Sequence, residues 1–494
     1  MKHLKKIGSL FLALVMILAM SVSVYAGNIT IKNGANGSEY AAYKLLNATD
    51  GGAGKFSYTV NYKYRSVLEK VTSKTKDSEI VSYISELDAT ALRAFADEIY
   101  ANIKNMSAEK TTDSDTFADV EPGYYLIAET KLGNAEDTYS LVMLDTAGNE
   151  NCEVKTKEDK PTLVKKLKEK NDSTGQVTDW QDGADYDVND VIPFKLTGTV
   201  SNLYDSYKTY YYAFHDVMSA GLTFDETSVV VKVDGVEISP NQYSVKTNNL
   251  KDGCTFEVVF DDLKKVGSVK SNSAITVEYN ATLNDNAVIG SGGNPNKAKL
   301  EYNNNPYASS KPDKPGETPW DTVIVFTYKL IANKVDGQGN ALNGAGFTLY
   351  KFDFTENDYV AVGNEITGVT TFTFERLDAG KYKLVETTVP AGYNKAEDLE
   401  FTVEATYDTD AADPKFGNLV VNDSKGNIIS DGENKIFTTN LNEGSASTTI
   451  KNLSGSELPS TGGIGTTIFY VVGVILMLGA GVLLVTKKRM SSNR

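Results

Sequence analysis

Three residues in the C-terminal part of the chain, Lys334, Glu386 and Asn452, have types and positions that could form an amide bond. Each lies in a short run in which alternate residues are apolar, and alternate side chains of a β-strand point to the same face. If these runs are strands of one sandwich, an amine, a carboxylic acid and a carboxamide face the same apolar core. Lysine is seldom buried without a partner, so the combination indicates chemistry.

The reaction that suits such a group is condensation of the lysine amine with the asparagine side chain. Burial disfavours charge, so it lowers the pKa of a lysine and raises that of a carboxylic acid. The neutral amine of Lys334 can then attack the carboxamide of Asn452, while protonated Glu386 hydrogen-bonds its carbonyl oxygen and transfers the proton. Ammonia leaves, and the resulting isopeptide bond closes a long loop as a disulfide would. The alternative is a plain ion pair between Lys334 and Glu386.

A second place for chemistry lies near the C-terminus, at Leu458, Pro459, Ser460, Thr461 and Gly462. Proline fixes the backbone, and glycine leaves the carbonyl group of Thr461 open to a nucleophile. An apolar run over 464–485, about long enough to span a bilayer as a helix, and a basic cluster over 487–489 follow. Together these features resemble the sorting signal that sortases of Gram-positive bacteria cleave between Thr461 and Gly462. A single-pass membrane protein is the alternative.

The N-terminus is consistent with export. Residues 1–6 are basic, residues 7–20 are apolar, and residues 24–26 offer small residues at the cleavage positions. This pattern is typical of a secretory signal peptide that is cut after Ala26. We therefore expect the mature chain to lie outside the cell, anchored to the cell wall at the surface.

The segment 382–393 resembles the E-box of sortase-assembled pilins and of Cna-B-type domains. It has Tyr-x-Leu-x-Glu-Thr followed by Pro-x-Gly-Tyr, and Asn452 lies just ahead of the sorting signal, as in that family. Val389 stands where the family often has alanine. The resemblance implies the major shaft subunit of a covalent pilus, whose partners are sortase, identical subunits and peptidoglycan. Such a subunit is a substrate, not an enzyme, apart from its own single-turnover bond formation.

The same resemblance implies a second isopeptide bond in a middle domain. Alternation places Lys165 on one face with two leucines. The segment 212–222 resembles the part of pilus backbone subunits that carries a catalytic aspartate, which implies Asp216. The segment 296–306 resembles the asparagine-bearing strand, which implies Asn304. Because a one-residue slip inverts the face of a strand, Lys166 and Asn303 stay open as alternatives.

A covalent polymer also needs an exposed acceptor amine on each subunit. In the family this is a lysine at the end of the first domain, and spacing from Val154 implies Lys157, with Lys155 and Lys160 as alternatives. The first domain also has a segment similar to the E-box, which places Glu129 in register, but we identify no matching lysine and asparagine there.

The alternative function is a wall-anchored adhesin that binds a host surface protein and never polymerises.

Strands must position these residues. Short alternating runs rich in Thr, Val, Tyr and Phe, separated by Gly, Asn and Asp, are typical of half-buried antiparallel strands. We expect a mainly β fold of tandem β-sandwich domains, which the resemblance makes immunoglobulin-like, of the Cna-A and Cna-B types. Residues 88–104 have helical apolar spacing behind a possible N-cap, Asp88, and predict a small helical insertion in the first domain.

Boundaries are expected at 160–161 and in the proline-rich connector 311–319. The expected parts are a signal peptide (1–26), an N-terminal pilin domain (27–160), a middle isopeptide-forming domain (161–322), a C-terminal Cna-B-type domain (323–457) and the sorting signal (458–494).

Composition excludes several classes of function. The chain has 49 basic and 65 acidic residues, and this net negative charge argues against binding to nucleic acid. The two cysteines, Cys152 and Cys254, are expected in different domains and unpaired. His215 is the one histidine after the signal peptide, and we expect it to face away from Asp216 without a catalytic role. No cofactor and no metal site are expected.

Overall fold

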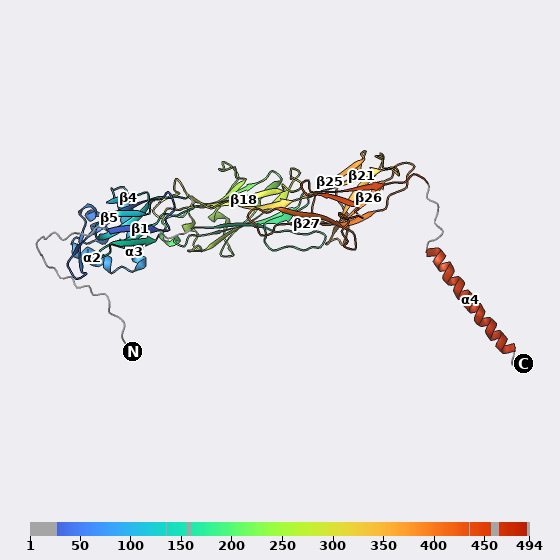
Figure 1. Cartoon of the computed structure of the whole chain (residues 1–494), viewed down its shortest axis with the longest axis horizontal. Helices are drawn as coiled ribbons and strands as arrows, with labels where there is room; N and C mark the ends of the chain where they lie inside the picture. The colour runs from blue at the N-terminus through green and yellow to red at the C-terminus, as the bar shows by residue number, and fades with distance from the viewer. Residues whose placement is uncertain (1–26, 135, 156–159, 434, 456–463, 492–494) are drawn as a thin grey trace. The chain divides into compact units, whose positions relative to one another are not determined.

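The computed structural model describes residues 27–134, 136–155, 160–433, 435–455 and 464–491 (Figure 1). The predictions on the signal peptide, on Lys157 and on residues 458–462 lie outside the described residues. The chain forms two compact units. The first unit comprises the chain up to Leu167 together with Val191–Thr282 and Pro295–Val323, and the second comprises Lys168–Asp190, Leu283–Asn294 and Ile324–Arg494. The division into three domains stays a prediction.

The N-terminal part of the first unit combines two small sheets with three helices. One sheet has the order β5-β1-β8, and the other has the order β3-β2-β6-β7, with β4 paired to β2. The helices pack on the second sheet through a shared apolar core, and they lie together on one side of the strands (Figure 1). The elements are β1 (Gly27–Lys32), β2 (Glu39–Asp50), β3 (Phe56–Val60), α1 (Arg65–Thr72), α2 (Asp77–Ser85), α3 (Ala89–Ile103), β4 (Lys110–Thr112), β5 (Thr116–Val120), β6 (Gly123–Lys131), β7 (Leu141–Asp145) and β8 (Asn151–Lys155).

The expected helical insertion is confirmed as α3. Asp88 is its N-cap, and the side chain accepts hydrogen bonds from the backbone N–H groups of Thr90 at 3.0 Å and Ala91 at 2.8 Å. These bonds satisfy two of the donors that the first turn of a helix leaves free. Helices α1 and α2 were not predicted.

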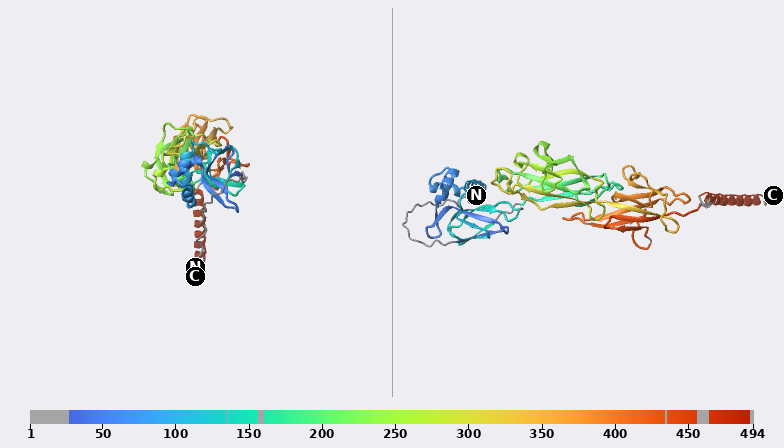
Figure 2. Two further views of the ribbon diagram at one scale, coloured as in Figure 1. Left: turned by 90° about the vertical axis from the view of Figure 1, so that its left-hand side faces the viewer. Right: turned by 90° about the horizontal axis from the view of Figure 1, so that it is seen from above.

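The remainder of the first unit is a β-sandwich. One sheet has the order β14-β13-β17-β11-β9, and the strands β18-β12-β16-β15 run in the facing sheet. Figure 2 shows these green and yellow strands from two further directions. The strands are β9 (Leu163–Leu167), β11 (Val191–Thr199), β12 (Tyr212–Met218), β13 (Leu222–Val233), β14 (Val236–Glu237), β15 (Ser244–Lys246), β16 (Phe256–Phe260), β17 (Ala274–Leu283), β18 (Asn294–Tyr302) and β19 (Gly316–Glu317).

The second unit contains another sandwich, with sheets of order β25-β21-β30-β29 and β23-β22-β26-β27-β28 around one apolar core. The first strand, β21, runs parallel to the last, β30. The strands are β10 (Gly183–Asp185), β21 (Tyr328–Val335), β22 (Gly346–Asp353), β23 (Asp358–Ala361), β24 (Ile366–Thr367), β25 (Thr371–Leu377), β26 (Gly380–Thr388), β27 (Leu399–Tyr407), β28 (Phe416–Asn422), β29 (Phe437–Asn440) and β30 (Ser445–Lys451); β20 (Asp321–Phe326) contains the boundary between the units.

The C-terminal apolar run forms α4 (Ile464–Ser491). Across the described residues, no helix combines the length and the apolar content that crossing a membrane requires. The predicted transmembrane span is therefore not supported.

Candidate functional site

The second unit brings Lys334, Glu386 and Asn452 together in its core. Lys334 lies on β21, and Asn452 directly follows the neighbouring parallel strand β30. The backbone N–H of Asn452 donates to the carbonyl oxygen of Val335 at 3.0 Å, which fixes the asparagine beside the lysine. Glu386 lies on β26 of the facing sheet and reaches across the core. Each of these three residues is 1% exposed.

One carboxylate oxygen contacts both nitrogens of this group. Nζ of Lys334 lies 3.1 Å from Oε1 of Glu386, and Nδ2 of Asn452 donates to the same Oε1 at 2.7 Å. Nζ of Lys334 also donates to Oδ1 of Asn452. The backbone N–H of Ala396 holds Oε2 of Glu386 at 2.7 Å. Burial lowers the pKa of Lys334, although the hydrogen bond and charge of Glu386 oppose this shift.

The first unit contains a second buried lysine with an acid. Lys165 on β9 and Asp216 on β12 are both 0% exposed and meet across the sandwich. Nζ of Lys165 donates to Oδ2 of Asp216 and also to the hydroxyl of Tyr279 at 2.7 Å. The alternation of β9 buries Lys165 and leaves Lys166 half-buried on the other face, as expected. Burial lowers the pKa of Lys165 and raises that of Asp216, while their mutual attraction opposes both shifts.

The structure does not bring Asn304 to this pair, so that prediction is corrected. On β18, Ala298 pairs with Asp216 of β12, and Asn304 lies six residues further on. Six residues of strand span about 20 Å. The backbone carbonyl of Asn304 instead accepts from the N–H of Tyr139 at 3.0 Å. The alternative, Asn303, is also at that end, where its side chain donates to the carbonyl of Thr209 at 2.8 Å.

Asn296, at the other end of β18, is the asparagine that lies near the buried lysine. It is 0% exposed, and its Nδ2 donates to the hydroxyl of Tyr279 at 3.1 Å. The same hydroxyl donates to Oδ2 of Asp216 at 2.7 Å and contacts Lys165. Oδ1 of Asn296 is buried without a hydrogen-bond partner among the described residues. Asn296 shares a face of β18 with Ala298, so alternation could have found it.

In the N-terminal part of the first unit, Glu129 is the acid that the similarity to the E-box placed in register. Glu129 is 4% exposed, and its contacts are with Ser38, Tyr40 and the backbone N–H of Ser140 at 3.2 Å. Burial raises the pKa of Glu129. No lysine amine is among these contacts.

The predicted acceptor, Lys157, is outside the described residues, but both alternatives are described. Lys155 ends β8 and is exposed. Lys160 forms an ion pair with Asp137 at 2.9 Å. Both expected free cysteines, Cys152 and Cys254, are unpaired.

Three families match separate parts of the chain. Residues 188–306 match the Gram-positive pilin backbone subunit 2, Cna-B-like domain, residues 328–415 match the prealbumin-like fold domain, and residues 452–492 match the LPXTG cell wall anchor motif. None of these is an enzyme family. The expected tandem β-sandwich fold, the resemblance to pilin backbone subunits and the location at the cell wall are confirmed.

The chain is similar to the trypsin-resistant surface T6 protein of Streptococcus pyogenes serotype M6, with 30% identity over 332 residues. The alignment covers 56% of this chain and 60% of the relative, which is less than two thirds of the relative's length. Among solved structures, the T6 backbone pilin of serotype M6 Streptococcus pyogenes shares the fold, with a TM-score of 0.56 and 18% identity over 89% of this chain and 100% of that one. The full-length major pilin SpaD from Corynebacterium diphtheriae is a weaker match, with a TM-score of 0.48 and 17% identity over 88% of this chain and 99% of that one.

Proposed function

The chain is built from domains of Gram-positive backbone pilins and carries an LPXTG anchor motif, and from this premise we propose that it is the shaft subunit of a covalent surface pilus. Its sandwiches are reinforced by two internal isopeptide bonds, Lys334–Asn452 and Lys165–Asn296. The observation that carries the proposal is the contact of one oxygen, Oε1 of Glu386, with both the amine of Lys334 and the amide nitrogen of Asn452.

This contact provides a path for the proton in the second unit. Nζ of Lys334, in its neutral form, attacks the side-chain carbonyl carbon of Asn452, so that an N–C bond forms. Glu386 accepts a proton from Nζ and gives it to Nδ2 of Asn452. The bond between that carbon and Nδ2 then breaks, and ammonia leaves. The reaction happens once in each chain, so it is autocatalytic without turnover.

The first unit supports the same reaction with different partners. Asp216 is the acid, Lys165 is the amine and Asn296 supplies the carboxamide. The hydroxyl of Tyr279 contacts all three side chains. It connects Asp216 to Asn296, whereas in the second unit the acid contacts the asparagine directly. Burial keeps the pKa of the Tyr279 phenol well above its usual value, so the hydroxyl stays protonated and can donate to the carboxylate.

Polymerisation would join the sorting signal of one subunit to an amine of the next. A sortase thiol attacks the carbonyl group of Thr461 and releases the part from Gly462 onward. The resulting acyl-enzyme is resolved by an amine of another subunit, for which Lys157 is proposed, with Lys155 and Lys160 as alternatives. A final transfer to a peptidoglycan precursor anchors the fibre.

Two measurements test the proposal. The intact mass of the exported chain, compared with its sequence mass, should be low by about 34 Da, since each bond loses one ammonia of about 17 Da. Cell-wall extracts in detergent should show a ladder of covalent multimers that disappears in a Thr461→Ala variant. An undiminished mass would refute both bonds, and a single anchored band in place of the ladder would indicate a monomeric adhesin. Replacing Lys157, Lys155 and Lys160 one at a time identifies the acceptor, because only its loss removes the ladder.

A further inference from the structure

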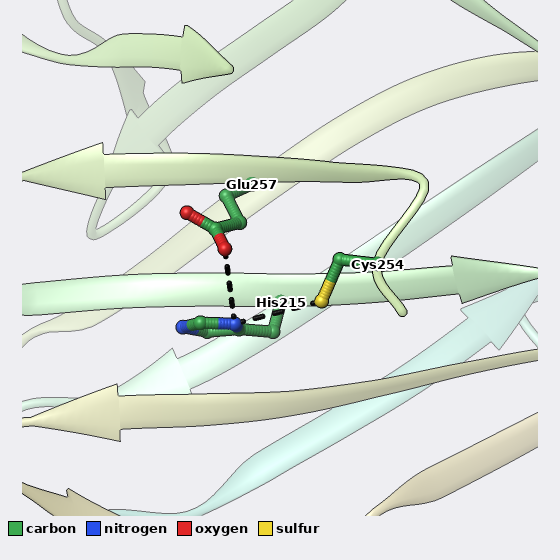
Figure 3. A group of neighbouring side chains, drawn as sticks. All are labelled: His215, Cys254 and Glu257. Carbon is green, nitrogen blue, oxygen red and sulfur yellow. Dashed lines mark hydrogen bonds and ion pairs between the residues drawn. The ribbon is translucent and has the colours of Figure 1, made fainter. Parts of the chain in front are cut away.

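A cluster of metal-binding side chains lies in the first unit, on the face of β12 opposite to Asp216. Figure 3 shows His215, Cys254 and Glu257 turned toward one another from β12, from the turn before β16 and from β16 itself. Nδ1 of His215 lies 3.6 Å from Sγ of Cys254 and 3.4 Å from Oε1 of Glu257. One ligand atom from each residue lies within 4.8 Å of the others.

These separations fit a tetrahedral zinc ion. With Zn–N of about 2.0–2.1 Å, Zn–S of about 2.3 Å and Zn–O of about 2.0–2.2 Å, tetrahedral angles place nitrogen and sulfur about 3.5 Å apart and nitrogen and oxygen about 3.4 Å apart. The two distances from Nδ1 of His215 match these values, and the separation between the sulfur and the carboxylate oxygen is within 4.8 Å. A thiolate, an imidazole and a carboxylate are also the ligand types that select zinc over magnesium or calcium.

The surroundings support His215 as a ligand. On the far side of its ring, Nε2 lies 3.4 Å from Oε2 of Glu301. A carboxylate on the second nitrogen is the usual outer contact of a metal-bound histidine, because it fixes the orientation of the ring. His215 is 2% exposed and Glu257 is 8% exposed, whereas Cys254 is partly exposed, which leaves a route for a cation from solvent.

Charge favours a cation at this position. Nearby lysines already pair with other acids: Lys299 binds Asp252 at 2.9 Å, and Lys311 binds Glu301 at 2.7 Å. Among the ion pairs of the described residues, Glu257 pairs only with His215. A divalent cation would therefore meet a carboxylate that no lysine neutralises.

We propose that His215, Cys254 and Glu257 bind a divalent cation of the zinc class, with water in the fourth position. On binding, the Cys254 thiol loses its proton to solvent and a metal–sulfur bond forms. The ion links β12 to β16 and to the turn that precedes it, on the outer face of the strand whose inner face carries Asp216. It thus stabilises the sheet that holds one wall of the Lys165 site.

The second unit contains another cluster of carboxylates, formed by Asp172, Asp187, Asp190 and Asp378. The amine of Lys351 already neutralises part of its charge. Nζ of Lys351 lies 3.1 Å from Asp172, 2.5 Å from Asp187 and 2.6 Å from Asp378. The acidic cluster therefore serves as a control for non-specific binding of metal by carboxylates.

The test uses the full chain after treatment with a chelator. Co²⁺ serves as the probe, because a thiolate ligand gives it a charge-transfer absorption band that oxygen ligands do not give. Zn²⁺ affinity is then measured by competition with a chromogenic chelator. The variants are Cys254→Ser, His215→Gln and Glu301→Gln, and the matched controls are Cys152→Ser, which removes the other thiol, and Asp378→Asn, which changes the acidic cluster.

We expect one Co²⁺ per chain, with the thiolate band present in the unaltered chain and in both controls. Cys254→Ser should abolish the band, and His215→Gln should weaken binding by more than tenfold. Glu301→Gln keeps all three ligands, so it should preserve the band and weaken Zn²⁺ binding by about 10- to 100-fold. The proposal is overturned if the unaltered chain shows no thiolate band, or if the band survives Cys254→Ser. Equal affinity in all variants would also overturn it, since the metal would then bind elsewhere.

Discussion

Replacing Glu386 by glutamine isolates the acid of the second unit, because the side chain keeps its shape and loses the ability to carry the proton. Without the acid, Lys334 and Asn452 should stay unlinked. The bond would close a loop between residues 118 positions apart, and closing a loop of that length stabilises a fold by roughly 5 kcal/mol in the chain-entropy estimate. For a unit of this size, such a loss lowers the thermal midpoint by roughly 10–20 °C.

The assay combines intact mass with thermal unfolding. In Glu386→Gln the shortfall from the sequence mass should drop from about 34 Da to about 17 Da, since only the first unit still loses ammonia. Glu404→Gln is the matched control, because this exposed glutamate lies on the neighbouring strand β27 and contacts no part of the site. The reasoning is refuted if Glu386→Gln keeps the full shortfall, or if the bond is lost and the midpoint stays unchanged.

A second variant separates the lost bond from the cost of an unpaired charge. In Glu386→Gln the amine of Lys334 stays buried without its acid, which destabilises the unit further. Lys334→Met removes the bond and the amine together and keeps most of the volume. We expect Lys334→Met to unfold at a higher temperature than Glu386→Gln, and both to unfold well below the unaltered chain.

Three further predictions concern the remaining sites. Asn296→Ala should remove about 17 Da of the mass shortfall, whereas Asn304→Ala should leave it unchanged, and the reverse result would restore Asn304 as the partner. Tyr279→Phe should slow the same bond, seen as a fraction of chains that keep the extra mass; a complete reaction would show that the hydroxyl only packs there. Burial and nearby aspartates raise the pKa of Glu169 from 4.5 to about 7. The folded state therefore holds a proton that the unfolded state has lost, so the stability of the second unit should fall as the pH rises from about 4.5 to 7, and Glu169→Gln should flatten this dependence of the thermal midpoint.

Local periodicity was enough to place Lys334, Glu386 and Asn452. Each is in a strand, or next to one, whose inward face is marked by alternate apolar residues, and this signal needs no knowledge of the other strands. The N-cap of α3 is also a local signal, because the Asp88 side chain accepts hydrogen bonds from N–H groups only two and three residues later. Helices α1 and α2 are short, with 8 and 9 residues, so their apolar pattern is too brief to recognise.

What the sequence could not supply was the pairing of distant strands. The inward face of β18 was identified, but which of its asparagines meets Asp216 depends on the register between β12 and β18, in which Met218 is opposite Asn296. Register is a property of the assembled sheet. The same limit applies to His215 and Cys254, which are 39 residues apart and meet only because β12 pairs with β16.

The proposed bonds also determine how each sandwich would respond to pulling. Lys334 lies on the first strand of its sandwich and Asn452 just beyond the last, so tension between them would pass through the bond and bypass the strands between. In single-molecule pulling of the full chain, this stretch should then add no length. Glu386→Gln should release a new extension of roughly 400 Å, the span of 118 extended residues. If the unaltered chain already released that length, the load would run through the folded strands and no bond would join Lys334 to Asn452.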